Sequence, residues 1–300
     1  MMPLRRLCRD GMNSKRILFL FVDGLGMGAD DPAVNPVFSG SCPILADLLR
    51  RIAVPIDASM GVAGFPQSAT GQAALLTGEN AAMLMGRHVE GFPGPKLKEL
   101  IREKNVFLRL NAMGLKSTFA NAYFIDDSKE LDQWRVQSVT TVATLSAFGA
   151  VRDRRLMEKG KAVYQDIVRD ELRPRGYTGP RISPADAAEH LAKIVVENDF
   201  TLFEYFQTDR AGHAGEPDKV RQVLSIFDEF ITPLLSHAER GEFLIILTSD
   251  HGNIEDLSTG GHTMNPVPFI AVGPDSPFFR DRVRSLTDIT PAILDWFSNR

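Results

Sequence analysis

Residues 244–256 read LIILTSDHGNIED, a short apolar run that ends in Ser249 and is followed by Asp250, His251 and Gly252. An apolar run of about four to eight residues is typical of a strand buried on both faces, as in a parallel sheet. A carboxylate and an imidazole at the end of a buried strand need partners, because burying either one unpaired costs free energy. We therefore expect a functional site where this strand ends.

Similar short runs alternate with helical patterns along the chain. Strands are predicted at 17–22 (ILFLFV), 54–58, 117–120 (STFA), 201–206 (TLFEYF), 243–248 (FLIILT) and 267–272 (VPFIAV). Helices are predicted after a Ser41 cap with Pro43 just inside, over 96–113, over 184–198, over 217–236, and from Thr287 through Trp296. This alternation predicts an α/β fold with a mostly parallel central sheet that helices cover on both faces. Ligands bind such sheets at the carboxyl ends of the strands.

One stretch, from about Tyr123 to Gly179, departs from this alternation. It carries the polar segment DDSKELDQWR and a predicted charged helix around Arg154–Arg173. We predict a core of residues 13–122 and 183–300, with a small cap or insertion at 123–182. Residues 1–12 are predicted to be disordered, and Met12 is an alternative start of the protein.

Composition excludes several classes of protein. The chain has 300 residues, a formal net charge of -4 and 44% hydrophobic residues, which is ordinary for a large globular domain. A mildly acidic chain is a poor partner for nucleic acid or an anionic membrane. The two cysteines, Cys8 and Cys42, form no CxxC pair, which argues against thiolate zinc sites and a disulfide framework. The apolar stretch 17–22 is too short for a signal peptide or a membrane span, so a cytoplasmic protein is predicted.

Polar side chains follow or precede five of the predicted strands. They are Asp23 after the first strand, Ser68 in FPQSATGQAALLTG, Asp209 and His213 in QTDRAGH, Asp250 and His251 after 243–248, and His262 in GGHTMNPVPF. Taken singly, most of these residues have an ordinary structural explanation: a turn for Asp23, a helix N-cap for Ser68 and a surface helical pair for Asp209 and His213. Taken together, three of the six histidines lie beside aspartates at strand ends.

The chemistry of this set indicates metal binding. Carboxylates and neutral imidazoles are ligands for zinc or manganese, and magnesium suits one such site. Three aspartates, three histidines and one serine are too many for one tetrahedral ion and suit two divalent ions about 4 Å apart. Two cations at that distance favour in-line displacement at phosphorus, and a serine beside a metal at a helix N-terminus is an activated nucleophile.

The motifs resemble the alkaline phosphatase superfamily. In order they are DGxG after the first strand, Ser-x-x-Gly, D-x-x-x-H, DHGN and H-T-x-NPVPF, and the ending SLTDITPAILDWF fits too. The closest likeness is to the metal-binding core of cofactor-independent phosphoglycerate mutases, over roughly 15–122 and 183–300. The resemblance implies a three-layer α/β/α fold with a mostly parallel central sheet and a small cap insertion.

By position, the resemblance implies two sets of metal ligands. One set is Asp23, Ser68, Asp250 and His251, and the other is Asp209, His213 and His262. Ser68 would be the nucleophile that becomes phosphoserine. Thr70 is a rival, because some relatives, including phosphopentomutases, use threonine.

The chain departs from the mutases in one respect that bears on the reaction. The mutases insert a whole substrate-binding domain that closes over the phosphoenzyme, whereas only the short cap is predicted here. An open site lets water finish the reaction, so a two-metal phosphohydrolase acting on a small phosphorylated substrate is predicted. The alternatives are a phosphomutase with a minimal cap and a non-catalytic metal-binding protein. Residues 65–75 lack the Cys/Ser-x-Pro-x-Arg context of sulfatases.

Basic side chains outside the metal ligands are candidates for substrate binding, because guanidinium suits phosphate. The candidates are Arg87 and His88, which follow the predicted nucleophile helix, and Arg152 in the predicted cap. Arg154 and Arg155 are better explained as a solvated basic face. The sequence carries no indication of the oligomeric state.

Overall fold

The computed structural model describes residues 15–299. The expectations for residues 1–12, Met12 and Cys8 lie outside this part of the chain. The described strands are β1 (Ile17–Val22), β2 (Val54–Ile56), β3 (Ser117–Phe119), β4 (Asn121–Ala122), β5 (Val163–Tyr164), β6 (Phe200–Tyr205), β7 (Leu244–Thr248) and β8 (Val267–Val272).

Helices make up most of the remainder. The α-helices are α1 (Pro43–Arg51), α2 (Ser68–Thr77), α3 (Ala81–Met85), α4 (Pro95–Lys104), α5 (Val106–Ala112), α6 (Val139–Phe148), α7 (Arg154–Glu158), α8 (Pro184–Val196), α9 (Gln207–Ala214), α10 (Pro217–Glu239), α11 (Ser276–Arg280) and α12 (Leu286–Ser298). The short 3-10 helices in the described part of the chain are η1 (Pro36–Phe38), η2 (Ser128–Gln133) and η3 (Asp170–Arg175). No helix among the described residues combines the length and the apolar character needed to cross a membrane.

The central sheet has the strand order β2-β8-β7-β1-β6-β3. Strands β7, β1, β6 and β3 run parallel, β8 is antiparallel to β7, and the edge strand β2 pairs antiparallel with β8. The parallel strands therefore end at one common edge, and the register sets Phe21 of β1 beside Glu204 of β6 and Thr248 of β7. The predicted mostly parallel sheet is confirmed.

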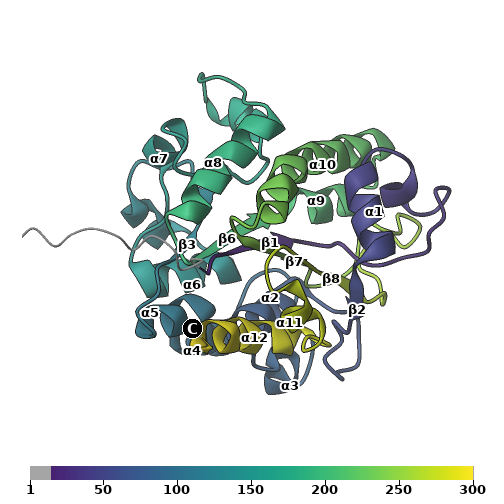
Figure 1. Cartoon of the computed structure of the whole chain (residues 1–300), viewed down its shortest axis with the longest axis horizontal. Coiled ribbons are helices and arrows are strands. Elements are labelled where there is room, and N and C mark those ends of the chain that lie inside the picture. The colour runs from purple at the N-terminus through teal and green to yellow at the C-terminus, as the bar shows by residue number, and fades with distance from the viewer. Residues whose placement is uncertain (1–14, 300) are drawn as a thin grey trace, which may run out of the picture.

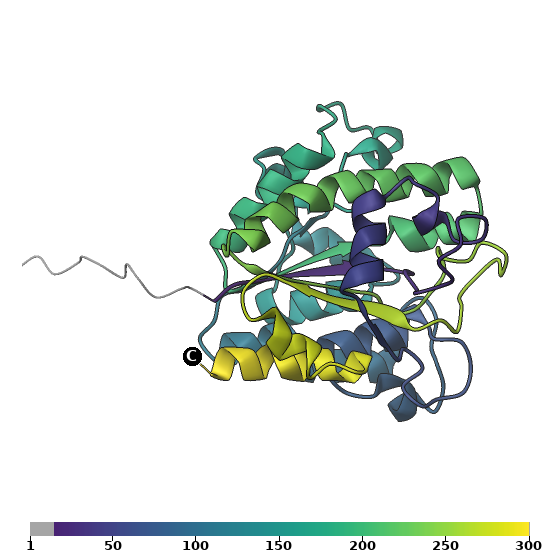
Figure 2. The same cartoon turned by 45° about the vertical axis from the view of Figure 1, so that its right-hand side comes forward.

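Helices cover both faces of this sheet (Figures 1 and 2). Successive side chains of strand β1 point to opposite faces of the sheet. Ile17, Phe19 and Phe21 belong to the apolar cluster on one face, and Leu18, Leu20 and Val22 belong to the cluster on the other. The first cluster packs against α2, α4, α5, α6 and α12, and the second against α1, α8 and α10. Fully burying each such side chain contributes about 1.5–3 kcal/mol, so both faces of the sheet stabilise the fold. The predicted three-layer α/β/α architecture is confirmed.

Two helix predictions were wrong. The predicted helix 96–113 is two helices, because Asn105 leaves the helical conformation and its side chain accepts a hydrogen bond from the Leu108 amide to begin α5. The predicted charged helix around 154–173 is instead the short α7, strand β5 and the 3-10 helix η3.

The predicted cap at Ser41 was also wrong. Cys42 is the N-cap residue of α1, and its side chain makes no capping hydrogen bond. Asp228 of α10 accepts hydrogen bonds from the Ile44 and Leu45 amides instead, at 3.3 and 2.7 Å. The free amides in the first turn of α1 thus find their hydrogen-bond acceptor in a side chain that is far away in the sequence.

The segment 123–182 contributes to two parts of the molecule. Strand β5 pairs with β4 in a small separate sheet, beside a small apolar cluster that includes Met157, Tyr164 and Tyr177. Helix α6, in contrast, packs Val139, Val142 and Ala143 into the main core. The segment is therefore anchored in the core on both sides of the sheet, by α6 on one side and by Val163 and Ile167, at and after β5, on the other.

Candidate metal centre

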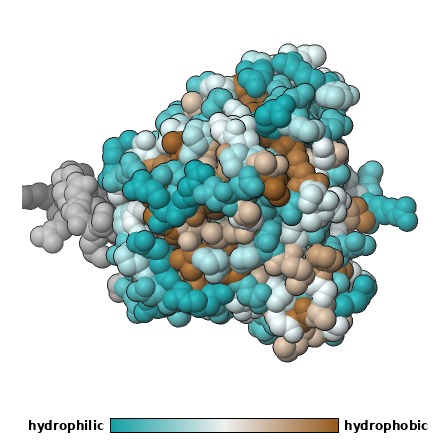
Figure 3. Space-filling view, turned by 90° about the vertical axis from the view of Figure 1, so that its right-hand side faces the viewer, coloured by the Kyte–Doolittle hydropathy of each residue, from teal (hydrophilic) through white to brown (hydrophobic). Residues whose placement is uncertain are grey.

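The carboxyl edge of the parallel strands brings all seven predicted ligands together. Asp23 follows β1, Asp209 and His213 lie one turn apart on α9 after β6, and Asp250 and His251 follow β7. Ser68 is the first residue of α2, and His262 lies in the loop before β8. Figure 3 views this end of the molecule, where apolar patches are interspersed with hydrophilic side chains.

The first cluster converges on one nitrogen of His251. Its Nε2 lies 3.0 Å from Oγ of Ser68, 3.3 Å from Oδ1 of Asp23 and 3.6 Å from Oδ2 of Asp250. His251 and Asp250 are fully buried, and Asp23 is nearly so. A single N–H can satisfy only one of these oxygens, whereas a cation would be coordinated by all four atoms.

The second cluster is a triangle of similar size. Nε2 of His213 lies 3.2 Å from Nε2 of His262 and 3.4 Å from Oδ1 of Asp209. The distance between His262 Nε2 and Asp209 Oδ1 is 3.7 Å. This cluster faces solvent, because the His213 side chain is 48% exposed. It adjoins the first cluster, since the His251 and His262 rings stack with centroids 3.7 Å apart.

Buried carboxylate oxygens test whether these residues fit a metal ion. Oδ1 of Asp23 and Oδ2 of Asp250 are buried without a hydrogen-bond partner. Burial raises the pKa of Asp23 well above its ordinary value, and the negative charge of Asp250 raises it further. Burial raises the pKa of Asp250 as well. Two unpartnered buried carboxylates repel each other. A divalent cation between them would offset the repulsion and would give each free oxygen a partner. The residues fit a metal.

The histidines are oriented as metal ligands are. Nδ1 of His262 lies 2.9 Å from the Pro66 carbonyl oxygen, and Nδ1 of His251 lies 3.4 Å from the carbonyl oxygen of Gly252. A ring whose Nδ1–H points to a carbonyl presents the lone pair of Nε2 to a metal. Without a cation, burial lowers the pKa of His251, but the neighbouring aspartates outweigh burial and raise it to about 10.

Several residues that support the ligands were missed in the sequence. Gln72 donates to Asp23 Oδ2 at 3.2 Å, and Asn253 donates to Asp209 Oδ1 at 2.7 Å. Glu255 is almost fully buried, and its carboxylate accepts hydrogen bonds from the Gly26 and Asn253 amides at 2.9 and 2.7 Å. Each belongs to a motif already identified (SATGQ or DHGNIE), so closer attention to the polar positions of those motifs could have found them.

Glycine permits the close approach of α2 to the first cluster. A Cβ atom at Gly71 would lie 2.8 Å from Cβ and 2.9 Å from the carbonyl oxygen of Asp250. No side chain fits there without moving the backbone that carries a ligand. The spacing of Ser68 and Gly71 therefore has a packing reason, because the glycine brings the start of α2 against the end of β7.

Ser68 and its rival Thr70 lie in different surroundings. Ser68 is half-buried and its oxygen contacts His251. Thr70 is fully buried, donates to the Gln67 carbonyl oxygen at 3.2 Å and accepts from the Val89 amide at 3.2 Å. The geometry therefore favours Ser68 as the residue that can reach a ligand.

The three predicted substrate-binding residues do not line the cavity at the clusters. This cavity has a volume of about 530 Å³ and is lined by Phe65, Gln67, Ser68, Glu90, Gly91, Asp209, His213, Thr259, Gly261 and His262. Arg87 is exposed outside it, and Nε2 of the buried His88 contacts the Val62 carbonyl oxygen at 3.1 Å. Arg152 is engaged elsewhere, because its guanidinium donates to the carbonyl oxygens of Phe119 and Lys161.

The sheet, its polar edge and the paired clusters define a class of protein, an alkaline phosphatase-like α/β protein with a candidate metal centre at the carboxyl ends of its strands. The chain matches the model of the Metalloenzyme superfamily over residues 15–299, and it belongs to that superfamily.

Named relatives agree with this assignment. The 2,3-bisphosphoglycerate-independent phosphoglycerate mutase of Myxococcus xanthus is 29% identical over 151 residues, which cover 48% of this chain and 28% of the mutase. The corresponding mutase of Acetivibrio thermocellus is 25% identical over 209 residues, 64% of this chain and 38% of the relative. The match thus spans less than two fifths of either mutase. Among solved structures, alkaline phosphatase from the Antarctic bacterium TAB5 has a TM-score of 0.57 and 16% identity, covering 96% of this chain and 99% of the phosphatase.

Proposed function

We propose that the protein is a metal-dependent phosphohydrolase that cleaves phosphate esters through a phosphoserine at Ser68. The observation that carries the proposal is the position of the Ser68 hydroxyl, 3.0 Å from Nε2 of His251 in a cluster with two buried aspartates. The hydroxyl stands at the first residue of α2, where the positive end of the helix favours an anion.

The two clusters are proposed to hold two divalent cations, manganese or zinc, with magnesium as a further candidate. Asp23, Ser68, Asp250 and His251 would hold one, and Asp209, His213 and His262 the other. When bound, the cations would supply positive charge that stabilises negative charge on the attacking and leaving oxygens at phosphorus. Asn253 and Gln72 would keep Asp209 and Asp23 in place through the hydrogen bonds described above.

The chemical steps follow from the position of Ser68. Its Oγ forms a bond to phosphorus and loses its proton to water, while the bond from phosphorus to the alcohol oxygen breaks and that oxygen takes up a proton. Water then forms the next bond to phosphorus, the bond to Ser68 breaks, and phosphate and the free serine are released. Solvent access supports hydrolysis as the second step, because His213 and Glu90 of the surrounding cavity are exposed.

The test is metal-dependent hydrolysis of para-nitrophenyl phosphate by the protein and by three variants. We expect Ser68→Ala and Asp250→Asn to lose about 10³-fold or more of the activity, because each removes a group that acts at phosphorus or holds the cation. Thr70→Val is the matched control, since it removes a neighbouring hydroxyl that bonds only to main-chain atoms. Acid quenching followed by mass spectrometry of the peptide is expected to find phosphate on Ser68. Turnover that survives in Ser68→Ala would contradict the proposal.

A phosphomutase is the second candidate, and the similarity to phosphoglycerate mutases favours it. The two activities differ in the fate of the phosphoryl group. A phosphohydrolase releases inorganic phosphate in step with the alcohol, whereas a mutase returns the group to a second hydroxyl of the substrate. Phosphate release measured with a molybdate assay therefore distinguishes them.

A further inference from the structure

A second cavity, with a volume of about 610 Å³, adjoins the metal centre. Phe92 and Arg210 line it, and they directly follow Gly91 and Asp209, which line the cavity at the metal clusters. The loop at 90–92 and the first turn of α9 are therefore walls of both cavities. A molecule held in the second cavity would therefore lie beside the cavity at the clusters.

The sheet also links this cavity to the clusters. Glu204 of β6 lines the cavity, and its register partner in β1 is Phe21. Asp23 lies two residues beyond Phe21, directly after the end of β1, so Glu204 lies beside the strand that leads into the first cluster.

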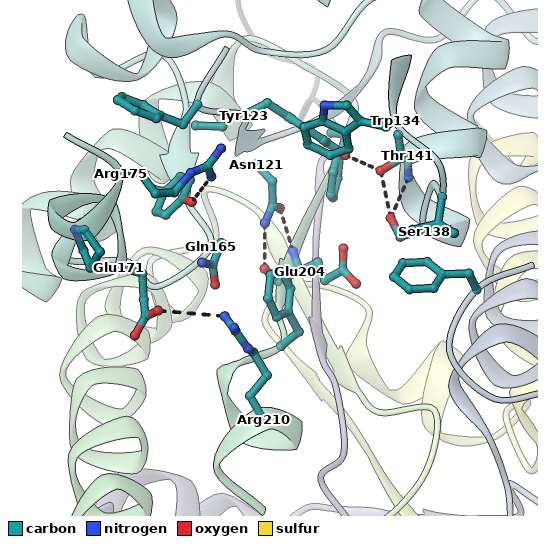
Figure 4. Close-up of a pocket in the computed structure, with 18 residues that line it drawn as sticks. Asn121, Tyr123, Trp134, Ser138, Thr141, Gln165, Glu171, Arg175, Glu204 and Arg210 are labelled. Atoms are coloured by element: carbon teal, nitrogen blue, oxygen red, sulfur yellow. Dashed lines mark hydrogen bonds and ion pairs between the residues drawn. The ribbon is translucent and has the colours of Figure 1, made fainter. Parts of the chain in front are cut away.

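Aromatic side chains form much of the wall of the second cavity (Figure 4). They are Phe92, Phe119, Tyr123, Phe124, Trp134, Tyr164 and Phe206. Tyr123 packs against Trp134 with ring centroids 6.1 Å apart and against Phe119 with centroids 6.5 Å apart. Trp134 and Phe92 are 42% and 52% exposed, although both are large apolar side chains. Exposed aromatic rings beside a cavity are typical of a binding surface for an apolar group.

Most polar groups in the wall are already engaged with one another. The Tyr123 hydroxyl lies 2.7 Å from Oγ1 of Thr141, whose oxygen also lies 2.8 Å from Oγ of Ser138. Glu204 accepts a hydrogen bond from Thr140 at 2.7 Å. Against the aromatic wall, a hydroxyl-rich alcohol would lose its water and regain few hydrogen bonds, whereas a flat apolar ring needs none. The charged residues Arg175, Arg210 and Glu171 lie together on the opposite side of the cavity in Figure 4.

From this arrangement we infer that the second cavity is the subsite for the alcohol part of the substrate, and that it selects phosphate esters whose alcohol carries an aromatic ring system of about naphthalene size. The inference rests on the proposed phosphohydrolase function, because it assigns the leaving group of that reaction. Phosphorus is held at Ser68, and the ring occupies the space between Phe92 and Trp134.

The kinetic test compares two esters with similar chemical reactivity, 2-(1-naphthyl)ethyl phosphate and n-propyl phosphate. Both are primary alkyl phosphates, so a difference in kcat/KM reports binding of the ring rather than the quality of the leaving group. We expect kcat/KM to be about tenfold or more higher for the naphthyl ester. Trp134→Ala and Phe92→Ala are expected to remove most of that preference, because they should lower kcat/KM for the naphthyl ester far more than for n-propyl phosphate. Met83→Ala is the control, because Met83 is 65% exposed and lines neither cavity.

A binding experiment separates this inference from the proposed function. The chain has two tryptophans, and the Trp296→Phe variant leaves Trp134 as the single tryptophan reporter. Titration of this variant with 2-(1-naphthyl)ethanol is expected to change the Trp134 fluorescence, more weakly when Phe92→Ala is added. Binding without hydrolysis of either ester would overturn the proposed function and leave the subsite standing. The subsite would be overturned if the protein hydrolysed both esters without preference, or if Trp134→Ala kept the preference for the naphthyl ester. The absence of a fluorescence change would overturn it as well.

Discussion

Glu204 is the one buried acid of strand β6. Burial raises its pKa to about 7 from an ordinary value of 4.5; the hydrogen bond from Thr140 lowers it and the charge of Asp250 raises it. Between these two pKa values the folded protein holds a proton that the unfolded chain has lost. The free energy of unfolding therefore falls as the pH rises from about 4.5 to about 7, by roughly 3 kcal/mol in all at about 1.4 kcal/mol per unit of pKa difference.

Replacing this acid by its amide removes the effect. In chelator-treated protein, we expect Glu204→Gln to be more stable than the parent at pH 8, with a difference that shrinks toward pH 5. Urea unfolding at a series of pH values measures the difference. Glu239→Gln, at an exposed position near the end of α10, is the control. Parallel stability curves for the parent and Glu204→Gln would show that Glu204 is not protonated in the folded state.

At the scale of the element, α1 depends on a residue of another helix. Its first turn donates to Asp228 of α10 through the Ile44 and Leu45 amides. We expect Asp228→Ala to lower the free energy of unfolding by about 1–2 kcal/mol, as for the loss of a helix N-cap. Asp228→Asn should cost less, because an amide oxygen still accepts a hydrogen bond. Urea unfolding tests this with Glu229→Ala, an exposed neighbour, as the reference. Equal losses for Asp228→Ala and Glu229→Ala would contradict the capping role.

The stability of the whole molecule is expected to depend on metal. A cation that binds the folded state alone stabilises it, by about 2.7 kcal/mol per site at a concentration one hundred times Kd. We therefore expect the melting temperature to rise when manganese or zinc replaces a chelator. Asp250→Asn should be more stable than the parent in chelator, because it removes one of two repelling buried carboxylates, and should gain less from metal. Asp218→Asn, at a position 95% exposed, serves as the control. If metal raised the melting temperature of Asp250→Asn as much as that of the parent, Asp250 would be ruled out as a ligand.

The polar motifs were predictable because their signals are local. Asp23, Asp250 and His251 each follow an apolar run directly, and parallel strands must end at one edge, so the residues had to meet there. The same argument covers His213, since a separation of four residues on a helix returns to the same face as Asp209. Their convergence within 3.0–3.7 Å agrees with this reasoning.

The sequence by itself thus determined the α/β layering and the parallel strands, and it predicted which polar residues gather where those strands end. These features depend on the hydrophobic period and on the residues that directly follow each strand, which are neighbours in the chain. Only the tertiary structure decided what depends on residues far apart in the chain. Asp228 caps a helix that begins near residue 43, and Phe92 and Trp134 meet Glu204 around one cavity. No local pattern encodes such contacts, since they arise only when packing brings separate elements to the same place.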